Sequence, residues 1–203
     1  MELFKLIYNK IKKPQTVIEH AVGVALGASV LLLIPLMAKI FSKEFLWSGF
    51  DFFAAWILFF SAGLTYRLVA RKMQNKMYHA AVGLAVITGL FLIWSNLAVG
   101  LIGNEDNPAN GMYFGVIAIG FLGAIVVRFK PKGMMKVLLV LAVSHVLIAV
   151  IAIVLRQELA PESSLVEILS VNGFFLVLWT GSAMLFRNAA IDIENESKTM
   201  PTV

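Results

Sequence analysis

The sequence contains no cysteine. This absence excludes disulfide bonds, thiolate metal sites, iron–sulfur clusters held by the chain and cysteine nucleophiles. Charged residues are also scarce: Asp, Glu, Lys and Arg make up 14% of the 203 residues, whereas soluble domains usually carry about 25%. So little polar surface cannot coat a globule in water, which excludes a soluble domain of ordinary composition.

The motifs of common enzyme classes are missing as well. The sequence has no phosphate-binding P-loop, no G-x-S-x-G nucleophile elbow and no H-E-x-x-H zinc motif. It also has no long polar segment that could form an ATP-hydrolysing domain. The sequence therefore favours a protein that is not an enzyme, although it does not exclude one.

Long apolar runs take up most of the chain. Hydrophobic residues make up 60%, and the mean hydropathy is +0.86. A hydrocarbon core about 30 Å thick needs roughly 20 apolar residues per helix, and continuous apolar runs favour helices over alternating strands. We therefore predict an all-α polytopic membrane protein, a bundle of six transmembrane helices. The six windows are about 17–38, 46–66, 78–102, 112–128, 135–155 and 167–187.

The basic residues indicate the orientation of these helices. Fourteen of the 17 Lys and Arg residues fall in the N-terminal tail, the second and fourth connections and the C-terminal tail. The positive-inside rule places these segments, and both termini, in the cytoplasm. It also accounts for the net charge of +5 without a nucleic-acid partner. The expected partner is the lipid bilayer, and a homo-oligomer or a larger membrane complex stays open.

Two polar segments flank the predicted transmembrane domain at 17–187. In residues 1–16, Leu3, Phe4 and Ile7 fall on one side of a helix, away from the lysines. This pattern predicts an amphipathic segment that lies in the cytoplasmic interface. Residues 188–203 form a polar cytoplasmic tail.

Similar helix ends suggest three repeated helix hairpins. Arg67, Arg128 and Arg187 each follow a patch of small residues at the end of an even-numbered helix, and His20 and His79 lie near the starts of the first and third helices. An internal duplication would explain these similarities. Arginine is common at the inner ends of membrane helices in any case, so both interpretations stay open.

Glycines four residues apart predict close contacts between helices. Gly23 and Gly27 lie in the first predicted helix, and Gly111 and Gly115 begin the fourth. Such spacing lets two backbones approach each other closely. We expect these contacts to be within the chain.

The most polar stretch lies between the third and fourth predicted helices. Residues 104–110 hold two carboxylates and three amides, and Asn96 is an amide within the preceding helix. Such oxygens suit Ca²⁺ or Mg²⁺, but the spacing is not that of an EF-hand, and a helix cap with Pro108 in the first turn explains part of it. We favour a polar outer vestibule, to which Asp51 and Asn172 would add, over a metal site. Its predicted binding residues are Trp94, Asn96, Glu105, Asp106, Asn107, Asn110 and His145.

The stretch from Trp94 to Tyr113 also carries a family resemblance. It reads W-S-N-L-A-V-G-L-I-G-N-E-D-N-P-A-N-G-M-Y. It resembles a signature of small bacterial inner-membrane proteins with six helices, a family without known activity, and the likeness continues to Met134. The resemblance implies a multi-pass protein of the bacterial inner (plasma) membrane. It brings no catalytic or binding residues.

Three histidines remain as candidates for chemistry. His145 lies near the middle of the fifth predicted helix, where an ionisable residue is costly and therefore a candidate by default. A neutral, hydrogen-bonded His145 is the simpler interpretation, and a membrane hydrolase that uses it is the weaker one. His20 and His79 lie at similar depth on different helices, so they could be the axial ligands of a b-type haem. Histidines that reach water at the membrane surface are the simpler interpretation of this pair.

These observations leave several functions open. The leading hypothesis is a membrane protein without catalytic residues or cofactor, which transports or senses a small solute or ion or serves as an accessory subunit of a larger assembly. The alternative is a redox protein with haem b between His20 and His79. A hydrolase is a third and weaker option.

Overall fold

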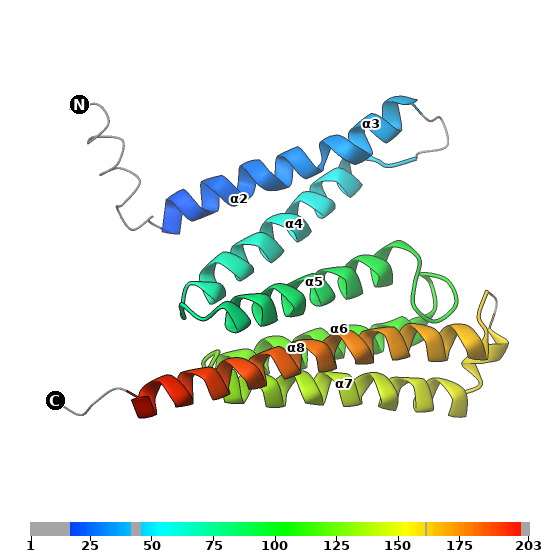
Figure 1. Cartoon of the computed structure of the whole chain (residues 1–203). Coiled ribbons are helices and arrows are strands. Elements are labelled where there is room, and N and C mark those ends of the chain that lie inside the picture. Colours follow the sequence, from blue (N-terminus) through cyan, green and yellow to red (C-terminus); the bar gives the residue numbers. More distant parts are fainter. Residues whose placement is uncertain (1–16, 42–45, 161, 200–203) are drawn as a thin grey trace. The chain divides into compact units, whose positions relative to one another are not determined.

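The computed structural model describes residues 17–41, 46–160 and 162–199 (Figure 1). Within these residues the fold is all-helical, and six helices are long and apolar enough to cross a membrane. The prediction of six apolar helices is thus confirmed, and the architecture fits an integral, multi-pass membrane protein. The predicted amphipathic segment at 1–16 lies outside the described residues.

The chain divides into two compact units, residues 1–68 and residues 69–203, here named the first and second unit. The first unit contains α2 (Val17–Leu31), α3 (Leu33–Phe41) and most of α4 (Gly49–Ala70). The helices α2 and α3 form one apolar span, interrupted at Leu32. The cause is Pro35, which has no N–H to donate to the carbonyl of Leu31 and crowds that turn.

The helices of the first unit approach each other at a glycine. A Cβ atom on Gly63 of α4 would lie 2.7 Å from Cγ1 of Val24 on α2, so only glycine fits there without movement of the valine. The indole of Trp56 donates to Ser29 Oγ across the same helix pair, at 3.0 Å. Ser48 and Asp51 form a capping box at the start of α4: the N–H of Asp51 donates to Ser48 Oγ, and the N–H of Ser48 donates to the Asp51 carboxylate.

The second unit is a bundle of four long helices, which Figure 1 shows side by side. The elements of this unit are α5 (Lys76–Ala98), the 3₁₀ turn η1 (Pro108–Asn110), α6 (Gly111–Val126), α7 (Pro131–Val154), the 3₁₀ turn η2 (Gln157–Leu159) and α8 (Leu165–Thr199). Asn75 caps α5 by accepting from the N–H of Tyr78, and Ser164 caps α8 by accepting from the N–H of Glu167. Pro131 occupies the first turn of α7.

Two helix ends differ from the predicted windows. The helix α5 ends at Ala98 rather than near 102, because Gly100 adopts a left-handed backbone with φ +75° and turns the chain. The helix α8 continues through the predicted tail to Thr199 and extends past its neighbours (Figure 1). Its 35 residues span about 52 Å at 1.5 Å per residue, well beyond a hydrocarbon core of about 30 Å.

The helix α8 packs against both α5 and α7, and α6 packs against α7. Three contacts set the register of α8 on its neighbours: Ser182 Oγ donates to the carbonyl of Ala81, Phe91 packs on Phe174 and Phe175, and His145 pairs with Asn172. The residues that these contacts bury form the core of the second unit.

The predicted glycine contacts are not found within either unit among the described residues. A Cβ atom on Gly111 or Gly115 of the second unit would meet no described atom within 4 Å, and the same holds for Gly23 and Gly27 within the first unit. The close approach of α6 and α7 occurs at Gly120 and Gly123 instead, where added Cβ atoms would lie 3.0 and 2.9 Å from Leu141 and Val137. Spacing alone cannot tell which face of a helix meets a neighbour.

Candidate functional site

The buried polar side chains of the described residues all lie in the second unit. Protein interiors and lipid both penalise such groups unless each is hydrogen-bonded. The hydrogen-bond partners of each buried polar group therefore show whether that group serves only to stabilise the fold. They are Thr88, Asn96, Asn110, His145, Asn172 and Ser182.

His145 is completely buried at the centre of a hydrogen-bonded cluster. The indole of Trp179 donates to its Nε2 at 3.1 Å. Because indole can only donate, Nε2 must be the unprotonated nitrogen, and Nδ1–H then donates to Asn172 Oδ1 at 3.2 Å. The imidazole is therefore neutral, and both of its nitrogens are occupied.

Asn172 and Tyr113 complete this cluster. The Asn172 amide donates to the hydroxyl of Tyr113 at 3.0 Å and to the carbonyl of Ile168 at 2.9 Å. The His145 ring stacks on Phe175, with 5.2 Å between the ring centroids and 14° between the planes. Residues of α6, α7 and α8 are thereby joined in one network, which we call the central network: Tyr113, His145, Asn172 and Trp179.

The central network does not suit hydrolysis. A general base needs a free ring nitrogen within reach of a nucleophile, but both nitrogens of His145 face groups that are not nucleophiles. The hydroxyl of the adjacent Ser144 donates to the carbonyl of Val140, and that of Ser182 donates to Ala81. The geometry thus supports a structural role for His145 rather than the hydrolase.

Asn110 holds the loop between α5 and α6 in place. Its Oδ1 accepts from the N–H groups of Leu101 and Ile102, both at 2.9 Å, and its Nδ2 donates to the carbonyl of Asn104 at 2.8 Å. A Cβ atom on Gly100 would lie only 2.5 Å from that same carbonyl oxygen. The loop is therefore tightly folded, and its own Leu101 and Ile102 side chains are buried.

Asn107 caps the 3₁₀ turn η1, which leads into α6. Its side chain accepts from the N–H of Ala109 at 2.9 Å, and Pro108 follows at the first position of η1. Its Nδ2 also donates to Oε1 of Gln157 at 3.0 Å. This hydrogen bond joins the α5–α6 connection to the α7–α8 connection at one end of the second unit.

The remaining predicted vestibule residues differ in their surroundings. Glu105 and Asp106 are exposed at the loop, and Trp94 is half-buried in the last turns of α5. Asn96 is 5% exposed, and its Oδ1 has no hydrogen-bond partner among the described residues. Asp51 lies in the first unit, where it accepts from Ser48. The predicted set is therefore not one continuous hydrogen-bonded cluster.

Two further acceptors without a partner lie near the same end. Glu158 Oε2 and Ser163 Oγ, both in the α7–α8 connection, are buried atoms with no hydrogen bond among the described residues. With Asn96 Oδ1 they make three unsatisfied oxygens in this unit, and we call them the unpaired oxygens. Sequence reasoning missed Glu158 and Ser163, because nothing in a short polar connection indicates which of its side chains are buried.

The charges of the second unit separate between its two ends. Around the connections at 99–110 and 155–167, the described residues hold five carboxylates and a single arginine, Arg156. Around 71–76, 127–136 and 187–199 they hold nine lysines and arginines and three carboxylates. Hydrogen bonds from Asn75 to Asp192 and from Lys132 to Glu194 join the segments of this second group. We call the two groups the acidic end and the basic end.

The haem alternative gains no support from the histidines. His79 Nε2 lies 2.7 Å from the carbonyl oxygen of Met73, which can only accept, so this nitrogen is protonated and engaged. His20 lies in the first unit. Among the described residues, no group of three or more His, Asp or Glu side chains could hold a metal ion.

Comparison of the chain with protein-family models, with curated proteins and with solved structures finds no match. The implication of a bacterial inner-membrane family therefore stays a prediction from the resemblance alone.

Proposed function

We propose that the protein is a non-enzymatic, multi-pass protein of the bacterial inner membrane that binds a small cationic or hydrogen-bond-donating solute at the acidic end of the second unit, and that it transports or senses this solute. The observation that carries the proposal is the set of unpaired oxygens at that end: Asn96 Oδ1, Glu158 Oε2 and Ser163 Oγ. Buried acceptors without donors are costly, commonly about 1–3 kcal/mol each.

The chemistry of these atoms defines the class of solute. A carboxylate oxygen and an amide oxygen accept only, so an ammonium group, a hydroxyl or a hard cation would satisfy them. The surrounding carboxylates would raise the local concentration of cations. Glu105 and Asp106 are exposed at the loop, where they would meet the solute first.

The orientation follows the charges. Positive charge retained in the cytoplasm would place the basic end inside and the acidic end outside, with both termini cytoplasmic. The proposed solute would then approach from outside. The threefold hairpin repeat is not part of this proposal, because Arg128 lies past the end of α6 whereas Arg187 lies within α8.

A thermal-stability screen of the purified full chain would test the proposal. Na⁺, K⁺, Mg²⁺, ammonium, ethanolamine and putrescine would be added at constant ionic strength. A ligand at 100 times its Kd stabilises the folded state by about 2.7 kcal/mol, so at least one of these probes should raise the Tm measurably. Asn96→Leu and Glu158→Gln should remove the shift, whereas Asn188→Leu, an exposed amide near the basic end, should keep it.

Two results would overturn the proposal. One is that no probe at millimolar concentration changes the Tm of the wild-type protein. The other is that a shift persists unchanged in Asn96→Leu and Glu158→Gln, which would place binding elsewhere. Co-purification with a larger complex without any solute response would favour the accessory-subunit interpretation instead.

A further inference from the structure

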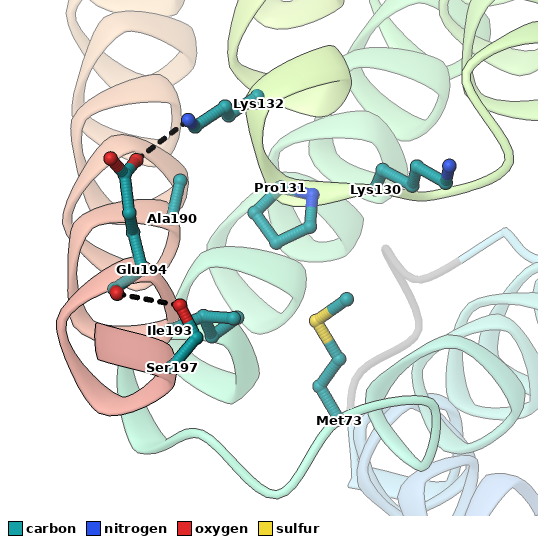
Figure 2. A pocket seen from close by; sticks show the side chains of 8 residues that line it. All are labelled: Met73, Lys130, Pro131, Lys132, Ala190, Ile193, Glu194 and Ser197. Atoms are coloured by element: carbon teal, nitrogen blue, oxygen red, sulfur yellow. Dashed lines mark hydrogen bonds and ion pairs between the residues drawn. The ribbon is translucent and has the colours of Figure 1, made fainter. Parts of the chain in front are cut away.

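A groove with a volume of about 440 Å³ opens at the basic end of the second unit (Figure 2). Its walls come from three places in the sequence: the α4–α5 connection, the start of α7 and the last turns of α8. Its lining residues are Met73, Lys130, Pro131, Lys132, Ala190, Ile193, Glu194 and Ser197.

The wall at residues 128–130 is firmly held. Arg128 and Phe129 both have left-handed backbones, with φ 55° and 60°, which make the tight turn between α6 and α7. The buried Tyr78 donates its hydroxyl to the carbonyl of Phe129 at 3.0 Å, and Lys72 Nζ lies 4.3 Å from the centre of the Phe129 ring. These contacts hold this wall of the groove without a ligand.

The floor and the rim of the groove differ in chemistry. Met73, Pro131 and Ile193 contribute apolar surface, and Ala190 is buried at 7% exposure. Figure 2 shows Lys130 and Lys132 on either side of Pro131, with the Lys132 ammonium group turned toward Glu194 and the Lys130 ammonium group turned away from it. A ligand that fits should therefore combine an anionic group with an apolar part.

The two lysines are not equivalent. Lys132 Nζ lies 2.8 Å from Glu194 Oε2, and Glu194 also pairs with Lys198 at 3.1 Å. Lys130 is exposed and has no ion pair among the described residues of this unit. With nine cations against three carboxylates at this end, the groove keeps a positive potential despite Glu194.

The groove also lies where lipid headgroups would be. The apolar span of α6 ends just before the 127–130 turn, and that of α7 begins just after it. This turn therefore marks the edge of the hydrocarbon core. The helix α8 continues about 15 Å beyond Ala189 at 1.5 Å per residue. These last turns form a wall at the level of the headgroups.

We propose that this groove binds the headgroup of an anionic phospholipid from the leaflet at the basic end. Its phosphodiester pairs with Lys130, whose exposed side chain would turn toward the groove, while Lys132 adds its charge nearby. The glycerol backbone and first methylenes lie on Pro131, Met73 and Ile193. Basic pockets between membrane helices on the cytoplasmic side bind such headgroups. Glu194 and Ser197 can accept hydrogen bonds from headgroup hydroxyls, which favours phosphatidylglycerol within this class.

Native mass spectrometry of the detergent-purified full chain would test this site. The protein would be titrated with phosphatidylglycerol, with phosphatidylcholine and with glycerol 3-phosphate. Phosphatidylglycerol should bind at least about tenfold more tightly than phosphatidylcholine, because only phosphatidylglycerol carries the net negative charge that the lysines attract. Glycerol 3-phosphate lacks the acyl chains and should not compete at equal concentration.

Two charge reversals separate the groove from general surface attraction. Lys130→Glu should weaken phosphatidylglycerol binding about tenfold. The matched control Lys76→Glu changes an exposed lysine of the same end that does not line the groove, and it should change binding less than about threefold. Both positions are exposed, so folding should be kept.

Equal losses in the two variants would show that the lipid follows overall charge, and they would overturn the site. Competition by glycerol 3-phosphate at equal concentration would also overturn it, because the site would then be one for a free anion. Neither outcome bears on solute binding at the acidic end, which a separate assay with separate variants measures.

Discussion

Asn172→Leu should destabilise the second unit more than either Trp179→Phe or Tyr113→Phe does. Leucine fills a similar volume but removes the acceptor for His145 Nδ1 and the donor to the Tyr113 hydroxyl. Leucine also removes the hydrogen bond to the Ile168 carbonyl, but that oxygen keeps its backbone hydrogen bond within α8. Two buried polar groups thus lose their partner, at about 1–3 kcal/mol each in proteins generally and about 0.6–1.7 kcal/mol each in membrane proteins. We expect a loss of about 2–4 kcal/mol.

The partners of Asn172 should follow in a defined order. Trp179→Phe leaves only His145 Nε2 without a donor, at about 1–3 kcal/mol. Tyr113→Phe removes the hydroxyl, but the Asn172 amide keeps its hydrogen bond to the Ile168 carbonyl, so the loss of stability should be about 0.5–1.5 kcal/mol. The double variant Tyr113→Phe/Asn172→Leu should cost less than the sum of its parts, because phenylalanine removes the hydroxyl that leucine leaves unpaired.

Equilibrium unfolding in mixed micelles, followed by circular dichroism, would measure these differences. Ser170→Leu is the matched control, because Ser170 is an exposed residue of the same helix, and its stability should stay within about 0.5 kcal/mol of wild type. A neutral Asn172→Leu variant, or additivity in the double variant, would refute the central network as a coupled, stabilising unit.

Three further outcomes follow from individual contacts. Gly100→Ala should lower the Tm, at a cost above about 1 kcal/mol, because the left-handed backbone and the carbonyl of Asn104 leave no room for a Cβ atom; an unchanged Tm would contradict the loop geometry. Asn110→Ala should leave the N–H groups of Leu101 and Ile102 without an acceptor and lower the stability by about 2–4 kcal/mol. Amide exchange in the α5–α6 loop should then be faster, and unchanged exchange would contradict this role of Asn110. Protein purified from haem-sufficient cells should show no Soret band, since His79 Nε2 is engaged with the backbone; a Soret band that His79→Ala removes would restore the haem alternative.

The sequence predicts the spans of this protein well, because their signal is local. Each needs only a run of about 20 apolar residues without charges, and the charged connections mark where the runs stop. The errors fall at ends that depend on single residues. Gly100 ends α5 early through its left-handed backbone, and nothing in the composition of 188–199 distinguishes a tail from the helix that α8 forms there.

The candidate site was predictable only in part. His145 and Asn172 stand out in the sequence as polar residues within apolar helices, whereas Tyr113 and Trp179 look like ordinary membrane aromatics. A signal for Trp179 did exist: Asn172, Phe175 and Trp179 fall on one face of α8 at the spacing of a packed helix. Which residues of α6, α7 and α8 meet depends on the register between helices, and that register is a property of the folded unit.

Both proposals use the predicted orientation of the second unit, and the absence of cysteine makes this orientation directly measurable. Glu105→Cys and Gln74→Cys would each place one thiol at an exposed position, the first at the acidic end and the second beside the basic end. A membrane-impermeant maleimide should label Glu105→Cys in intact cells and should label Gln74→Cys only after the membrane is permeabilised. Labelling of Gln74→Cys in intact cells, with Glu105→Cys protected, would contradict the orientation and with it an acidic end that faces outward.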